Sequence, residues 1–345
     1  MGANYWASIQ TAPFSEENIM RLSTFIHNNT TQWGVVANDD TIVPATTIPS
    51  APATLDEHIE NPQAAVIAAL RDAAITGGGI QQSAVRWCPP IRRPSKVIGV
   101  AINNKIGQKV AFRPFADPAF FFKPSSSLIG HGVPVVVKTS YGITHPEPEL
   151  AVIIGKGGSA IPEKDALSHV FGYTVINDIT SPGLKERDSI ELVARSAGGG
   201  GAYGKLLAWR QVRDEDHARS NYLTYHARSK GTDTFGPIGP WIVTADEIDD
   251  PNSLAINSFD SDQPAFVDST ANLTFSVERV IAHASAYMTF CAGDIIHCGT
   301  SMQPAPNGQF RGLTDWDLQN AHEHTMDITI DKIGTLSNPV HVVEG

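Results

Sequence analysis

Short hydrophobic runs rich in β-branched residues are the feature that most constrains the fold of this chain. Each run is five or six residues long and is bounded by Gly, Pro, Asp or Asn, which is typical of strands rather than of helices. The runs cover residues 97–102, 133–138, 149–154, 172–177 and 294–298, and helical patterns lie at 163–170 and 277–286. The chain is therefore predicted to be mainly β with some α.

The first part of the chain has a different pattern. Residues 20–45 alternate apolar and polar side chains around two turn clusters, HNNTT and ANDD, which predicts a short antiparallel meander. Residues 54–74 carry apolar side chains at helical spacing and predict one helix. Because the segment CPPIRRPSK resembles a linker, we predict a small N-terminal α+β domain over residues 1–92 and a larger domain over residues 93–345.

Residues at about 184–229 interrupt the succession of predicted strands in the larger domain. This segment holds the glycine run 198–201 and a charged stretch, RQVRDEDHARS. A long segment between strands is often a lid over a site. A solvated surface excursion is the alternative, so we predict an insertion and leave both roles open.

Charge and composition restrict the partners of the chain. Its 345 residues carry a net charge of -11, which argues against nucleic acid and anionic membranes as general partners. No run of eighteen apolar residues and no signal peptide is found, so we expect no membrane association. The three cysteines form no metal-binding spacing, which is typical of a reducing compartment, and we expect a cytoplasmic protein.

Two glutamates stand at the start of a strand that should be buried, in the stretch HPEPELAVIIGK. Residues i and i+2 of a strand share one face, so Glu147 and Glu149 would repel each other. A hard divalent cation such as Mg²⁺, Mn²⁺ or Ca²⁺ would remove this conflict. Asp178, at the end of the next strand GYTVIND, could complete a set of three carboxylates. The ordinary alternative for such a glutamate pair is a solvated strand edge.

Further segments in the same order resemble the fumarylacetoacetate hydrolase family. They are FFFKPSSSLIGHG, EPELAVIIGK, GYTVIND, SKGTDTFGPIGPWI and FSVERVIAHASAYMTFCAGDIIHCGT. The resemblance implies a mixed β-sandwich roll, usually dimeric, so we expect a homodimer. It also implies a divalent metal and a small-molecule substrate, a 2-oxo or 1,3-dicarbonyl acid of the acylpyruvate kind.

The resemblance also assigns roles to residues. Glu147, Glu149 and Asp178 would bind the metal, with Mg²⁺ expected and Mn²⁺ or Ca²⁺ as alternatives. Lys230 would meet negative charge that develops on the substrate. Thr300 and the backbone of Gly299 would contact the substrate carboxylate.

The chain departs from the family pattern where hydrolytic members carry a His–Glu pair that activates water. Gly107 and Val110 occupy those two positions. We consider His145 the first candidate to replace the base, with His217 and His226 as further candidates, and Lys185 as a further substrate-binding cation.

Three functions follow from this pattern. The first is metal-dependent hydrolysis of a C–C bond in catabolism. The second is decarboxylation or keto–enol tautomerisation, which needs no activated water. The third is an inactive member of the family that binds a small acid.

Overall fold

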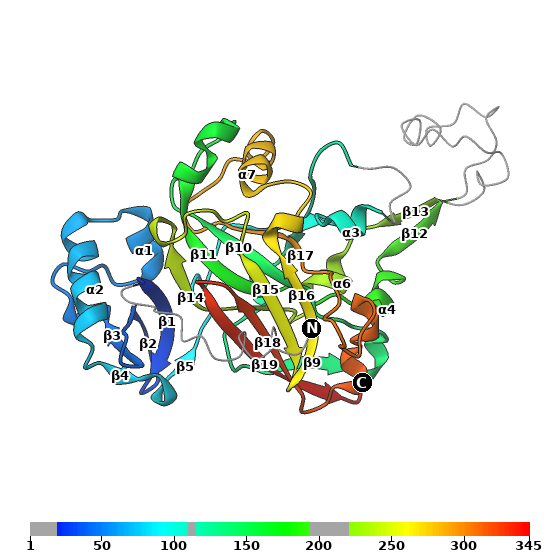
Figure 1. Ribbon diagram of the computed structural model, residues 1–345, viewed down its shortest axis with the longest axis horizontal. Helices are drawn as coiled ribbons and strands as arrows, with labels where there is room; N and C mark the ends of the chain where they lie inside the picture. The colour runs from blue at the N-terminus through cyan, green and yellow to red at the C-terminus, as the bar shows by residue number, and fades with distance from the viewer. Residues whose placement is uncertain (1–18, 110–114, 193–220) are drawn as a thin grey trace, which may run out of the picture.

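The computed structural model describes residues 19–109, 115–192 and 221–345, and these confirm the mainly β fold. The central feature is a large sheet with the strand order β4-β3-β2-β1-β14-β11-β10-β17-β6-β7. In Figure 1 this sheet runs from the small N-terminal part through the middle of the molecule.

The middle of the large sheet contains six strands. They are β6 (Val97–Ala101), β7 (Ala119–Lys123), β10 (Pro148–Ile154), β11 (Val170–Asn177), β14 (Gly236–Thr244) and β17 (Ile295–Thr300). The sequence predicts four of them, β6, β10, β11 and β17, but not β7 or β14. Every residue of β10 and of β17 is buried, so both faces of the sheet are covered at this point. Such strands are expected to be continuously apolar, and polar residues inside them therefore require a reason.

A second sheet covers one face of the first. It has the order β16-β15-β18-β19-β9, formed by β9 (Val135–Lys138), β15 (Ala255–Asp260), β16 (Gln263–Ser269), β18 (Thr325–Ile330) and β19 (Gly334–Val343). Leu150 and Val152 of β10 share a core cluster with Ile328 and Ile330 of β18. Figure 1 shows these strands in front of the large sheet, with α7 (Val277–Ser285) above them.

The N-terminal part contains the predicted meander, formed by β1 (Arg21–His27), β2 (Thr30–Val36) and β3 (Thr41–Pro44). The prediction of one helix over residues 54–74 is wrong, because the structure has α1 (Leu55–Glu60) and α2 (Ala64–Thr76). Pro62 stands between them; proline lacks an amide hydrogen and excludes the helical conformation at the residue before it.

The sheet and the core both continue across residue 92. Arg21 and Leu22 of β1 pair with Val243 and Ile242 of β14, and apolar residues of α1 and α2 share a cluster with Ile153 of β10. The domain boundary near residue 92 stays a prediction.

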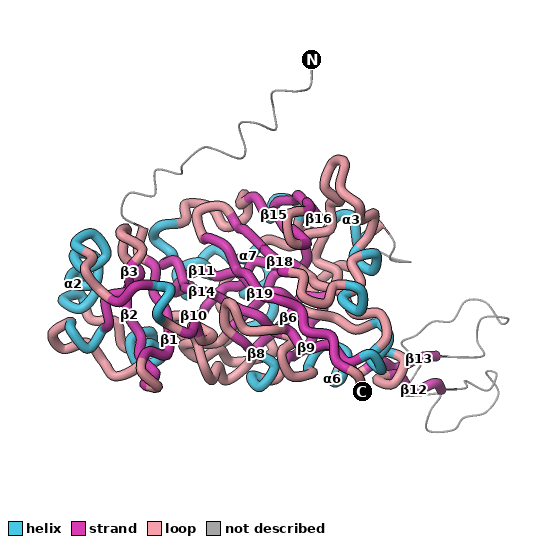
Figure 2. Tube along the Cα trace, turned by 90° about the horizontal axis from the view of Figure 1, so that it is seen from below, coloured by secondary structure: helices cyan, strands magenta, loops and turns pink. Residues whose placement is uncertain are grey.

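The predicted insertion begins with α4 (Pro182–Lys185), and the hairpin of β12 (Ser189–Leu192) and β13 (Asn221–Thr224) follows. In Figures 1 and 2 this hairpin projects from the body of the molecule. The chain then returns through α6 (Ala227–Gly231). The glycine run 198–201 lies outside the described residues.

The remaining elements are short. They are α3 (Lys105–Gln108), β4 (Ile80–Gln81), β5 (Arg86–Trp87), β8 (Leu128–Ile129) and the 3-10 helices Ala45–Thr47, Gln82–Ala84, Ser125–Ser127, Thr139–Tyr141, Glu163–His169, Ala245–Glu247, Thr270–Asn272, Leu313–Asp315 and Leu318–Asn320. Among the described residues, no helix has the length and apolar character needed to cross a membrane.

Candidate metal centre

The register between β10 and β11 brings the first glutamate and the aspartate together. Pro148 pairs with Asn177 in antiparallel fashion, so Glu147 and Asp178 lie opposite each other. The amide of Asp178 donates to the carbonyl of Glu147 at 2.9 Å, and the amide of Glu147 donates to Asn177 Oδ1 at 2.9 Å. Two strands fix these two carboxylates next to each other.

Thr300 of β17 joins the two glutamates from the other side of β10. Glu149 pairs with Thr300 across the antiparallel strands. The Thr300 hydroxyl lies 2.9 Å from Glu147 Oε2 and 3.0 Å from Glu149 Oε1. The two glutamates therefore share one face, as the strand alternation predicts.

Gly299 and Thr300 both bind glutamate oxygens in the structure. The Gly299 amide donates to Glu149 Oε2 at 2.7 Å, and the Thr300 hydroxyl lies between the two glutamates. Their predicted role in binding a substrate carboxylate stays a prediction.

Two buried lysines complete the cluster. Lys230 of α6 donates to Glu147 Oε2 at 3.0 Å and also to Asp178 Oδ2, so its ammonium group bridges these carboxylates. Lys123, at the end of β7, donates to Asp178 Oδ1 at 2.7 Å and to the carbonyl of Lys230. Lys123 stands in FFFKPSSSLIGHG, one of the segments that carry the family resemblance.

These contacts and burial shift the pKa values of the buried groups, and for Lys123 burial lowers the pKa more than Asp178 raises it. Burial raises the pKa of Asp178, but Lys123 and Lys230 outweigh it, and the pKa lies below its ordinary value. Burial also raises the pKa of Glu147, and Lys230 brings it below the ordinary value. Burial lowers the pKa of Lys230, but Asp178 and Glu147 raise it above the ordinary value.

The charges and donors of this cluster fit a divalent cation. Two lysine side chains contact Glu147 and Asp178, whereas Glu149 is held by hydrogen bonds from Gly299 and Thr300 and lies beside His297, with no lysine as a countercharge. A buried unpaired charge is very unfavourable, and carboxylate oxygens are the donors that hard divalent cations prefer. The assignment of these three residues as metal ligands stays a prediction.

A fourth side chain that the sequence did not single out is part of the cluster. Glu149, Asp178 and His297 each offer one donor atom, and these atoms lie within 4.8 Å of one another. His297 is fully buried, and its Nδ1 lies 2.8 Å from Glu149 Oε2. Among the described residues, Glu147 is not one of these three. Its carboxylate is connected to that of Asp178 by the Lys230 ammonium group, which contacts both.

His145 is placed beside the cluster. It is 5% exposed, and its Nε2 lies 3.9 Å from Glu147 Oε1. Burial lowers the pKa of His145 more than Glu147 raises it. Nδ1 lies 3.3 Å from the carbonyl oxygen of Pro146, which only accepts hydrogen bonds, so the neutral ring presents its free lone pair at Nε2.

Among the other predicted residues, those that the structure describes form no hydrogen bond or ion pair with the three carboxylates. Lys185 is exposed at the end of α4, and among the described residues no ion pair joins it to the cluster. His226 begins α6 in the left-handed conformation. His217 and Val110 lie outside the described residues. Gly107 of α3 is buried and faces Met302.

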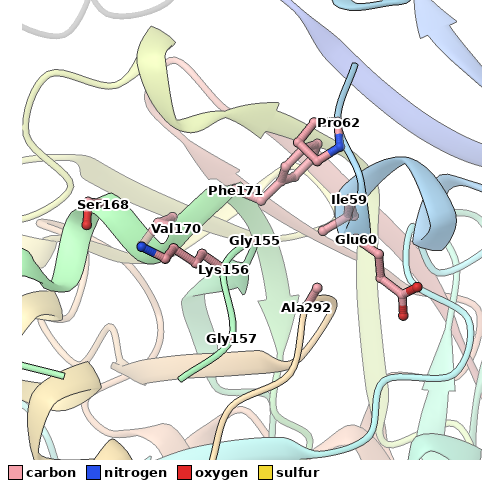
Figure 3. Close-up of a pocket in the computed structure, with 10 residues that line it drawn as sticks. All are labelled: Ile59, Glu60, Pro62, Gly155, Lys156, Gly157, Ser168, Val170, Phe171 and Ala292. Atoms are coloured by element: carbon pink, nitrogen blue, oxygen red, sulfur yellow. The ribbon is translucent and has the colours of Figure 1, made fainter. Parts of the chain in front are cut away.

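A cavity of about 540 Å³ lies at the other end of β10, between that strand's C-terminal turn and α1. Figure 3 shows its lining, which includes Glu60, Lys156 and Phe171. Glu147 and Glu149 stand at the N-terminal end of β10, so this cavity is separate from the carboxylate cluster.

The family model described as fumarylacetoacetate (FAA) hydrolase C-terminal matches residues 96–341. The chain belongs to this family. The match spans all three carboxylates, both buried lysines, His145 and His297, so the whole cluster lies inside the family domain.

Two named members of the fumarylacetoacetate hydrolase family are similar in sequence to this chain over most of its length. Oxaloacetate tautomerase YisK of Bacillus subtilis is 31% identical over 265 residues, which are 75% of this chain and 74% of that protein. The mitochondrial oxaloacetate tautomerase FAHD2A of Homo sapiens is 31% identical over 293 residues, 85% of this chain and 81% of that protein.

Solved structures of family members have the same fold. Maleylpyruvate hydrolase from Sphingobium sp. SYK-6, in complex with manganese(II) and pyruvate, matches with a TM-score of 0.66 and 26% identity over 94% of this chain and 99% of that one. A 5-carboxymethyl-2-hydroxymuconate delta-isomerase from Mycobacterium smegmatis matches with a TM-score of 0.62 and 25% identity over 94% and 99% of the two chains. These relatives are enzymes of several reaction types.

Proposed function

We propose that this protein is a divalent-metal-dependent enzyme that enolises a 2-oxo acid. The observation that carries the proposal is the buried cluster of three carboxylates and two lysines, in which Glu149 has no lysine as a countercharge. Glu147, Glu149 and Asp178 would hold the metal. When bound, a divalent cation stabilises the negative charge of an enolate and chelates adjacent oxo and carboxylate oxygens.

The chain's own residues supply the proton transfer and a fixed positive charge. His145 Nε2, which is free and borders Glu147, takes the proton next to the substrate carbonyl and returns it to form the tautomer. Lys230, held by Glu147 and Asp178, places an ammonium group where the enolate oxygen develops charge. The burial of both groups excludes water from the proton transfer.

Keto–enol tautomerisation of an oxaloacetate-like acid is the reaction that we favour. It needs one neutral base and no activated water, and this agrees with the site, since α3 carries Gly107 where hydrolytic members carry a histidine. Two relatives at 31% identity are named oxaloacetate tautomerases. C–C bond hydrolysis is the second candidate, favoured by the fold match to maleylpyruvate hydrolase.

Parallel assays with Mg²⁺ or Mn²⁺ separate the candidates. Oxaloacetate is followed by its enol absorbance and by pyruvate release, and fumarylpyruvate by the release of two acids. The proposal predicts loss of the enol signal faster than in the protein-free control, without matching pyruvate release. Cleavage of fumarylpyruvate would support hydrolysis, pyruvate release would support decarboxylation, and no turnover of either acid would contradict the proposed enzyme.

A further inference from the structure

His297 reaches the carboxylate cluster only because β17 contains a β-bulge. Glu149 pairs with Thr300, but Ala151 pairs with His297. An advance of two residues along β10 therefore corresponds to three residues along β17. Gly299 lies in the bulged part of β17 and has φ +117°, a conformation that favours glycine. In a regular strand His297 and Thr300 would face opposite sides; the bulge turns both toward Glu149.

The neighbouring strand leaves room for the imidazole ring. His297 pairs with Gly99 of β6, and a Cβ at position 99 would lie 2.5 Å from His297 Cε1 and 2.2 Å from the Phe121 ring. The Phe121 ring is T-shaped to that of His297, with 5.4 Å between centroids. Glycine at position 99 therefore allows this histidine to lie against Glu149.

The hydrogen bonds of His297 are incomplete. Nδ1 lies 2.8 Å from Glu149 Oε2 and forms its hydrogen bond with that oxygen. Nε2 is buried and has no hydrogen-bond partner within the described part of the chain. Nε2 lies on the side of Gly99, where an added Cβ would be 2.6 Å away, so Nδ1 is the nitrogen that faces the carboxylates and could reach a cation held by them.

We propose that His297 is a nitrogen donor to the metal, beside Glu149 and Asp178, and that it gives the site a preference for Mn²⁺ and related transition metals over Mg²⁺. This inference rests on the proposed function, since it requires the same metal centre. The donor atoms of these three residues lie within 4.8 Å of one another and are buried.

The chemistry of the donors determines the preference. To bind a metal through Nδ1, the ring must release its Nδ1 proton or hold it at Nε2, beside Phe121, so binding is coupled to proton movement. Imidazole nitrogen suits transition metals, whereas Mg²⁺ and Ca²⁺ favour sites made only of oxygen. Replacing the nitrogen should therefore weaken Mn²⁺ binding more than Mg²⁺ binding.

The test is pulsed electron paramagnetic resonance of Mn²⁺ bound to the full chain, which detects a directly coordinated ¹⁴N nucleus. Wild type should show this coupling, and ¹⁵N-histidine labelling should change it to the ¹⁵N pattern. His297→Asn keeps an N–H group near the position of Nδ1 but removes the imidazole donor. We expect it to lose the coupling and to lower the ratio of Mn²⁺ to Mg²⁺ affinity by about tenfold or more.

Two control variants identify the histidine. His324 is the matched control, because its Nδ1 lies 2.8 Å from the Asp260 carboxylate, outside the metal centre. The nitrogen coupling should persist in His324→Asn. His145→Asn should also keep it. Mn²⁺ bound to wild type without nitrogen coupling, or coupling that persists in His297→Asn, would overturn the role of His297. Wild type that binds no Mn²⁺ would instead overturn the metal centre of the proposed function.

Discussion

Lys230 is the residue that keeps the carboxylates together when no metal is bound. Its ammonium group contacts both Glu147 and Asp178, and its side chain is 8% exposed. Because these contacts hold the pKa of Lys230 above its ordinary value, the group is charged across the physiological range. Its removal would leave carboxylates facing each other in a buried site.

The Lys230→Met variant should be less stable by about 3–5 kcal/mol in metal-free buffer, the usual cost of breaking a buried ion pair. Added Mn²⁺ should raise its melting temperature more than that of wild type, because the cation supplies the missing positive charge. Lys332→Met removes an exposed pair with Asp249 and should cost under about 1 kcal/mol. Equal effects of Mn²⁺ on wild type and Lys230→Met would contradict this account.

His145 has a separate prediction, because it borders the cluster without being one of the expected ligands. The His145→Gln variant should turn over at least about 100-fold more slowly, the usual contribution of a general base. Its affinity for Mn²⁺, measured by calorimetry, should stay within about threefold of wild type. A loss of metal affinity as large as the loss of turnover would show that His145 acts in holding the metal.

At the scale of single elements, strand β6 supports the site through one glycine. The Gly99→Ala variant places a Cβ within 2.5 Å of the His297 ring, so the imidazole must move. Overpacking of this kind costs about 1–3 kcal/mol, and Mn²⁺ affinity should fall with it. Gly312→Ala is the matched control, because nothing lies within 4 Å of the added Cβ. Unchanged Mn²⁺ affinity in Gly99→Ala would show that β6 does not position His297 for metal binding.

The elements of the site show what the sequence could and could not predict. The strand predicted over residues 149–154 is β10, Pro148–Ile154, and strand alternation placed Glu147 and Glu149 on one face. Asp178 was found because the end of β11 is marked by an apolar run. These features depend on local periodicity, which the sequence carries.

His297 could not be found in the same way. It stands between apolar residues in β17, where alternation alone assigns it to the face opposite Thr300. The bulge that reverses this assignment depends on pairing with β10, a contact between segments almost 150 residues apart in the chain. The single helix predicted over residues 54–74 failed for a local reason, the underestimated effect of Pro62.

At the scale of the whole molecule, α1 packs another buried histidine where the N-terminal part meets the large sheet. His58 is 1% exposed, stacks on Trp33 with 5.0 Å between ring centroids and meets Phe171 of β11 edge-on. Burial lowers the pKa of His58. Protonation of this ring therefore opposes the packing of α1 against the sheet.

The stability of the chain should consequently fall in mild acid. Since the pKa of His58 is lower in the folded than in the unfolded chain, its contribution is fully present above about pH 6.5 and is lost as the pH falls toward the folded value. The His58→Phe variant keeps a stacked ring that cannot titrate, so its melting temperature should fall less between pH 7 and pH 5. An identical pH dependence in both proteins would rule out this role for His58.

The central claim is that the three carboxylates form a divalent metal site, and calorimetric titration with Mn²⁺ tests it most directly. Wild type should bind one Mn²⁺ ion per chain, and Glu149→Gln, which removes one of the buried carboxylate charges while keeping its size, should bind at least about 100-fold more weakly. Equal Mn²⁺ affinity in the two proteins, or no binding by wild type, would contradict the account.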